Sequence, residues 1–168
     1  MRFYSPFINM FMLDDDYIAL LRDFRHRLSL PLKHVGTSYD EGSKLHYPIF
    51  SLGGTHLHMN HYADRAFAEE KWQERLQRLN KEHLFFMMFT ERPNIAEAFD
   101  ALPYDRKVCF TSFPTDLPSA MYVKPYAACQ KPLGKPFWQT INGMANGTYP
   151  YYDIYELLMH GKKTYRSV

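Results

Sequence analysis

Cysteine is scarce in this sequence of 168 residues, in which Cys109 and Cys129 are the two present. They fit neither a CxxC spacing nor a disulfide framework, so we expect a reduced compartment. An excess of one charge is also missing, because 20 basic residues offset 18 acidic ones and leave a net charge of +2. Nucleic-acid-binding proteins usually present a strongly basic face. The sequence therefore predicts no nucleic-acid partner.

Long hydrophobic runs are absent as well. The apolar run over residues 7–13 is too short to span a membrane, and three aspartates, Asp14 to Asp16, end it. The run also lacks the small-residue cleavage site of a secretory signal. We therefore expect a soluble, cytoplasmic protein without a membrane span.

Several familiar catalytic motifs do not occur. The sequence has no HExxH zinc motif and no GxSxG nucleophile elbow. Residues 131–144 have the composition of an active-site loop, but without the spacing of a phosphate-binding or dinucleotide-binding loop. Cys109, within an apolar strand, is interpreted as a core residue rather than a nucleophile.

Aromatic residues, by contrast, are abundant at 17% of the chain, which favours a packed globular domain. Hydrophobic periodicity predicts strands and helices in alternation, and this order is typical of an α/β protein. The predicted strands cover residues 6–13, 32–35, 47–52, 55–62, 84–90, 107–111 and 120–124. The predicted helices cover residues 14–28, 63–80, 94–102 and 151–160.

The predicted architecture is a single domain over residues 1–168, a three-layer α/β/α fold with a mixed sheet. Gly53 and Gly54 lie between two strand segments and predict a hairpin, because tight hairpin turns need the positive φ that glycine accepts. A proline-rich loop region is expected over residues 112–137, before the C-terminal helix.

A cluster of histidines ends one of the hairpin strands. His56 and His58 would point to the same face of the strand, with His61 near its end. Such imidazoles can hold a metal or exchange protons in catalysis. The alternative is that they bond to the backbone and flank a core strand. No carboxylate ligand accompanies them, so we predict no metal and assign His58 and His61 as candidate catalytic residues.

The helix after this cluster carries a basic stripe. Lys71, Arg75 and Arg78 have helical spacing beside Trp72. Arginine binds phosphate or carboxylate well, and an indole can stack on a sugar or base. The alternative is a solvated helix face, with Glu74 paired to Arg78 and Trp72 in the core.

Taken together, several motifs resemble a bacterial family of exopolysaccharide-biosynthesis proteins built on a domain of unknown function. The similarity covers roughly residues 4–111. The matching segments are Tyr4-Ser5-Pro6, Tyr47-Pro48, His58-Met59-Asn60-His61-Tyr62, Lys71-Trp72-x-x-Arg75-x-x-Arg78-Leu79-Asn80, Phe99-Asp100-x-Leu102-Pro103-Tyr104 and Lys107-Val108-Cys109-Phe110-Thr111.

The resemblance implies a cytoplasmic α/β protein encoded with capsule, exopolysaccharide or lipopolysaccharide genes, often beside glycosyltransferases. It draws attention to residues that are candidates for ligand binding: Tyr62, Lys71, Trp72, Arg75, Arg78 and Asn80. Relatives usually carry a further strand and loop before the Ser5-Pro6 segment, so an inactive, shortened family member is one alternative.

The leading hypothesis is a protein of surface-polysaccharide biosynthesis that binds, or transfers from, a sugar nucleotide or phosphorylated glycan. Arg75 and Arg78 would bind phosphate, Trp72 or Tyr62 would stack on a ring, and His58 or His61 would act as general base. The second hypothesis is a non-catalytic partner of a glycosyltransferase. The third is a metal-dependent hydrolase that uses His56, His58 and His61. The cofactor is unknown.

Overall fold

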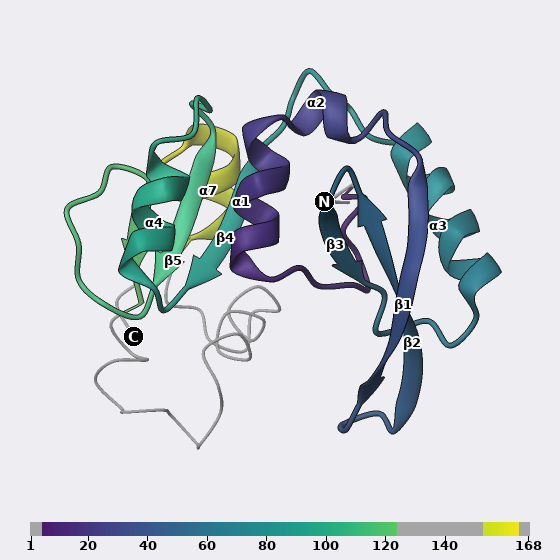
Figure 1. The fold of residues 1–168 in the computed structure, drawn as a ribbon. Helices are drawn as coiled ribbons and strands as arrows, with labels where there is room; N and C mark the ends of the chain where they lie inside the picture. The colour runs from purple at the N-terminus through teal and green to yellow at the C-terminus, as the bar shows by residue number, and fades with distance from the viewer. Residues whose placement is uncertain (1–4, 124–152, 165–168) are drawn as a thin grey trace. The chain divides into compact units, whose positions relative to one another are not determined.

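The computed structural model describes residues 5–123 and 153–164 of the chain. It divides into two compact units, residues 1–83 and 84–168 (Figure 1). The α/β class is confirmed, because helices accompany antiparallel strands in the first unit and parallel strands in the second. The sequence predicted parallel and antiparallel strand pairing within one mixed sheet. Both kinds of pairing occur, each in a three-stranded sheet of its own. The division into two units was not predicted, and the single domain stays a prediction.

The sheet of the first unit is a meander of β1 (Leu32–Asp40), β2 (Leu45–Leu52) and β3 (Thr55–His58). The predicted hairpin is confirmed, since Gly53 and Gly54 join β2 to β3 with φ of +58° and +89°. Gly53 is also confined by space, because a Cβ there would lie 2.6 Å from Leu30 Cδ1. The positive φ angles are therefore what require glycine in this turn, while at Gly53 an added Cβ would also oblige the Leu30 side chain to move.

Three helices complete the first unit: α1 (Asp14–Arg22), α2 (Phe24–Arg27) and α3 (Arg65–Gln77). The helix predicted over residues 14–28 is interrupted at Asp23, whose φ and ψ of −143° and 48° are not helical. Asp64 begins α3 as an N-cap, and its Oδ1 accepts a hydrogen bond of 2.7 Å from the Phe67 N–H. α1 packs against β3 and α3 against β2.

The strand predicted over residues 6–13 is wrong. These residues form turns, with a single antiparallel bridge between Phe11 and His58. Asn9 has a φ of +59°, which reverses the chain where a strand would continue. Ile8 and Leu13 are exposed rather than buried. The apolar run therefore does not enter the sheet.

The second unit contains a parallel sheet of β4 (Phe86–Thr90), β5 (Lys107–Thr111) and β6 (Ala120–Tyr122). Its helices are α4 (Pro93–Asp100), which packs on β4 and β5, and α7 (Ile154–His160). Four consecutive residues of β5, Val108 to Thr111, are buried, as expected for a strand covered on both faces. The predicted core role of Cys109 is confirmed.

The predicted end of α7 is also confirmed, since Gly161 adopts the left-handed conformation with φ of +67°. Predictions for Tyr4, Cys129, the end of the strand at Lys124 and the loop at 131–144 lie outside the described residues. Among the residues that the structure describes, no helix is long and apolar enough to cross a membrane.

Candidate functional site

His58 lies at the end of β3, between two aromatic rings. Its imidazole stacks on Phe11 with ring centroids 4.5 Å apart and planes inclined by 12°. On another side its Nδ1 lies 3.5 Å from the hydroxyl oxygen of Tyr47, a buried residue. The imidazole is therefore half-buried and has a hydroxyl beside one nitrogen.

Two charged groups of the first unit influence this imidazole. Burial lowers the pKa of His58 below its usual 6.5, the Asp16 carboxylate opposes that shift, and the His56 imidazole adds to it. His56 also approaches Asp16, with 3.4 Å between Nδ1 and Oδ1. Because burial dominates, His58 is neutral at physiological pH and can accept a proton.

The two histidines assigned as catalytic are not brought into contact. His61 is exposed after the end of β3 and makes no hydrogen bond or ring contact with His58 in the part of the chain that the structure describes. Its charge acts instead on Asp40, whose carboxyl pKa is lowered mainly by hydrogen bonds from Ser43 and to a smaller extent by His61. His58 thus has the more specific surroundings.

A metal centre gains no support from the described residues. Across residues 5–123 and 153–164, no group of three or more histidine, cysteine, aspartate or glutamate side chains is arranged to hold an ion. The hydrolase hypothesis based on His56, His58 and His61 therefore has no observation behind it.

Arg75 binds the protein itself. Its guanidinium donates hydrogen bonds to the Ile8 carbonyl and the Tyr62 hydroxyl, and lies 5.6 Å from the centroid of the Tyr62 ring. Tyr62 is buried. Both residues were predicted to bind ligand, and in the structure they bind each other and the segment before α1.

This segment, residues 5–13, is called the N-terminal strap here, and it connects the two predicted motifs. Arg75 binds the strap at Ile8, while His58 exchanges two backbone hydrogen bonds of 3.0 and 2.9 Å with Phe11. The histidine and arginine motifs therefore meet through the strap rather than by direct contact.

The remaining predicted residues lie along α3 or just after it. Trp72 is 1% exposed and packs on Phe7 with ring centroids 5.8 Å apart, so its indole has no face open to a ligand and belongs to the core. This corrects its assignment as a stacking residue. Lys71 pairs with Glu74 at 2.9 Å, and the exposed Arg78 donates to the Glu74 carbonyl at 3.2 Å.

Asn80 has a local role in the structure. Its Oδ1 accepts a hydrogen bond of 3.0 Å from the Glu82 N–H, which closes a turn after α3. The predicted alternative of a Glu74–Arg78 ion pair is replaced by the Lys71–Glu74 pair. Of the predicted basic stripe, Arg78 is the member left most open to solvent.

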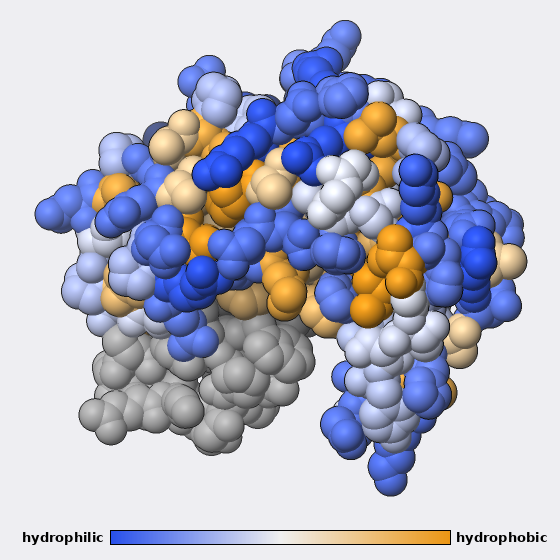
Figure 2. All heavy atoms as spheres, in the orientation of Figure 1, coloured by the Kyte–Doolittle hydropathy of each residue, from blue (hydrophilic) through white to orange (hydrophobic). Residues whose placement is uncertain are grey.

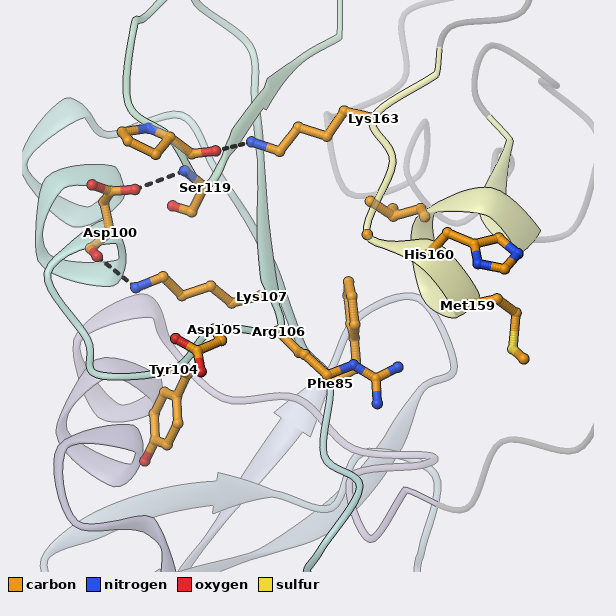
Figure 3. A pocket seen from close by; sticks show the side chains of 13 residues that line it. Phe85, Asp100, Tyr104, Asp105, Arg106, Lys107, Ser119, Met159, His160 and Lys163 are labelled. Atoms are coloured by element: carbon orange, nitrogen blue, oxygen red, sulfur yellow. Dashed lines mark hydrogen bonds between the residues drawn. The ribbon is translucent and has the colours of Figure 1, made fainter.

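A cavity of about 680 Å³ lies in the second unit, and none of the predicted site residues lines it. Its polar wall includes Asp100, Arg106, Lys107, Ser119 and Lys163 (Figure 3). These residues come from separate segments, each without a motif of its own. Lys107 and Asp100 do fall within segments that carry the family resemblance, and this is the sequence feature that could have pointed to the cavity.

Comparison with known proteins gives a family and one relative. A family model described as "Domain of unknown function (DUF1919)" matches residues 1–157. An uncharacterized protein of Haemophilus influenzae is 35% identical over 127 residues, which cover 73% of this chain and 58% of the relative. The matched part is thus less than two thirds of that relative's length.

Proposed function

Because this chain belongs to the DUF1919 family, we propose that it acts in the biosynthesis of bacterial surface polysaccharide, on a sugar nucleotide or phosphorylated glycan. The polymer would be an exopolysaccharide, a capsule or lipopolysaccharide, and the location would be the cytoplasm. One support is the set of motifs over residues 4–111 that resembles exopolysaccharide-biosynthesis proteins. The other is the chemistry available at His58.

The observation that carries the proposal is the half-buried imidazole of His58 between Phe11 and Tyr47, with a pKa lowered by burial. A neutral imidazole can take the proton from a sugar hydroxyl. The hydroxyl oxygen then bonds to the anomeric carbon of the donor, and the bond from that carbon to the phosphate oxygen breaks. His61, which is exposed, is the second candidate for the base.

The predicted binding residues take different parts in this proposal. Lys71 on α3 and Arg78 at the C-cap of that helix would neutralise the phosphate of the donor. Arg75 is a positioning residue, since it holds the strap against which His58 packs. Direct ligand binding by Tyr62 and Asn80 stays a prediction.

The test replaces His58 by glutamine in the bacterium that carries this chain. His58→Gln keeps hydrogen-bonding capacity toward Tyr47 but cannot take up a proton at neutral pH. We expect a loss of surface polysaccharide with an unchanged amount of folded protein. His26→Gln is the matched control, because His26 is exposed and its side chain pairs with Asp23 on the surface. Normal polymer in the His58→Gln strain would overturn the catalytic proposal.

A second candidate function is that of a non-catalytic partner of a glycosyltransferase. It is favoured by large hydrophobic side chains exposed on β1 and β2, with Val35 at 52%, Tyr39 at 43% and Leu45 at 46%. Figure 2 shows hydrophobic residues in several places among hydrophilic ones on one face. If Leu45→Asp abolished polymer formation while His58→Gln did not, this second function would replace the first.

A further inference from the structure

The antiparallel sheet of the first unit has an open edge along β1. β3 pairs with residues 49–52 of β2, whereas residues 45–48 of β2 pair with residues 37–40 of β1 beyond the end of β3 (Figure 1). Among the residues that the structure describes, no further strand pairs with β1. A ribbon of two strands alone is marginally stable in water, so a third strand beside β1 would stabilise it.

The opposite edge of the sheet is partly covered. At its end β3 exchanges backbone hydrogen bonds of 3.0 and 2.9 Å with the strap, between His58 and Phe11. The Pro48 carbonyl of β2 accepts a hydrogen bond of 3.1 Å from the Met59 N–H. The long β1 is therefore the edge of this sheet that is available to another chain.

Pro48 shows which backbone groups of β1 point to the open side. Thr37 lies opposite Pro48, and the two residues of a hydrogen-bonded antiparallel pair each donate an N–H. Proline has no N–H, so this pair is the non-hydrogen-bonded kind, and the backbone groups of Thr37 point away from β2. Because the direction alternates along a strand, the backbone groups of Tyr39 also point outward, while those of Ser38 point to β2.

The side chains beside these outward groups favour strand pairing. Thr37 and Tyr39 are both exposed, and threonine and tyrosine are common in strands. Sheet edges that stay unpaired are usually protected by lysine, proline or a bulge. In β1 the lysine and the register shift both come before Gly36, so residues 36–40 keep regular pairing with β2 and an unprotected edge.

The charges along β1 favour a second copy of the same strand as the partner. Lys33 lies near the beginning of β1, whereas Asp40 and Glu41 lie at its end. Antiparallel pairing of two copies about a two-fold axis brings the basic beginning of each strand toward the acidic end of the other. Parallel pairing would instead place like charges side by side, which is unfavourable.

We propose that two copies of this chain pair antiparallel along β1, with Ser38 at the two-fold axis. Thr37 of each copy then lies opposite Tyr39 of the other, and each such pair exchanges backbone hydrogen bonds through its outward groups. This register uses both outward-facing residues of the regular stretch. It also places a β-branched residue opposite an aromatic one, which stabilises a sheet. The inference goes beyond the proposed function and does not rest on it.

Disulfide formation by Ser38→Cys tests the pairing and its register. In the proposed dimer the two residues at position 38 form a non-hydrogen-bonded pair, with Cα atoms about 4.5 Å apart, which a disulfide can span. We expect mild oxidation of the full chain carrying Ser38→Cys to give a covalent dimer. Mass spectrometry of a digest should identify the link between the two residues at position 38, and the native chain shows what its own cysteines contribute.

Thr37→Cys is the matched control, because Thr37 is exposed whereas Ser38 is half-buried. In the proposed register the two residues at position 37 are diagonal neighbours, roughly 7–8 Å apart, which is too far for a disulfide without backbone movement. Chance collisions would link the more exposed position at least as fast. The proposed pair instead predicts that Ser38→Cys forms dimer roughly tenfold faster than Thr37→Cys.

Thr37→Pro provides the second test, since it removes an N–H that points away from β2. Sedimentation velocity of the native chain should show a dimer that grows with concentration, and Thr37→Pro should reduce it. The same substitution should slow disulfide formation by Ser38→Cys about tenfold. A native chain that is monomeric at every concentration, or disulfide formation no faster at position 38 than at 37, would overturn the proposal. Normal polymer in the His58→Gln strain would reject the proposed catalysis and leave the dimer result standing.

Discussion

A half-buried imidazole responds to pH differently from one in water, and His58 is such a group. Burial lowers its pKa below 6.5, so protons bind more readily to His58 in the unfolded chain than in the folded one. The contribution of this residue to stability is complete above the unfolded-state pKa. It is lost as the pH falls from 6.5 toward the lower folded-state value.

We therefore expect the free energy of unfolding to fall on acidification below pH 6.5 and His58→Gln to reduce that fall. Urea denaturation across this pH range measures the effect, and an NMR titration of the imidazole gives the pKa itself. Asp16→Asn should lower the pKa of His58 further, and His56→Gln should raise it, because Asp16 and His56 act in opposite directions. A measured pKa above 6.5 in the native chain would contradict the burial argument.

At the scale of elements, the N-terminal strap is held by side chains from β3 and α3. Arg75 binds the strap at Ile8, Phe11 forms a bridge with His58, and Phe7 packs on Trp72. The strap has no regular structure of its own. The conformation of the strap therefore depends on these contacts. Among the three, the contact of Arg75 is the one made by a charged side chain.

Arg75→Met tests that dependence, because methionine keeps part of the apolar stem and removes every donor. We expect the free energy of unfolding to fall by about 1–3 kcal/mol, since the buried Tyr62 hydroxyl loses its charged partner. Amide hydrogen exchange of residues 7–11 should become faster than in the native chain. Arg78→Met is the control, as Arg78 is exposed and bonds to one backbone carbonyl. Equal exchange in the two variants would show that Arg75 does not hold the strap.

Elements with a strong local signal were predictable. β5 has the predicted bounds, the Gly53-Gly54 hairpin forms, and Asp64 and Gly161 cap helices as expected. Residues 36–40 were predicted as polar loop but continue β1, because they pair with β2 although none of them is buried. Pairing between backbone groups leaves no hydrophobic pattern in such a strand.

The candidate sites were predictable in different degrees. The histidine motif led to His58, whereas the basic stripe on α3 was misjudged at Trp72, because helical spacing alone cannot tell a core face from a binding face. The cavity could not be found from the sequence. Arg106, Ser119 and Lys163 come from separate segments of the chain, and the folding of the second unit brings them around one cavity.

At the scale of the whole molecule, each unit contains buried aromatic side chains from its own sheet. Phe50 of β2 is fully buried in the first unit, and Phe110 of β5 is 1% exposed in the second. Phe50 belongs to the antiparallel sheet and Phe110 to the parallel one, and no strand of either sheet pairs with the other sheet among the described residues. Such an organisation predicts that the units lose their structure in separate steps.

Phe50→Ala and Phe110→Ala form a reciprocal pair that tests this prediction. Each should cost about 3–5 kcal/mol in its own unit, because a buried ring is replaced by a cavity. In hydrogen exchange followed by mass spectrometry, Phe50→Ala should speed exchange in β1, β2 and β3 and leave β4 and β5 as in the native chain. Phe110→Ala should do the reverse. If either variant instead sped exchange equally in both sheets, the chain would unfold as one cooperative body, and the single predicted domain would be the better description.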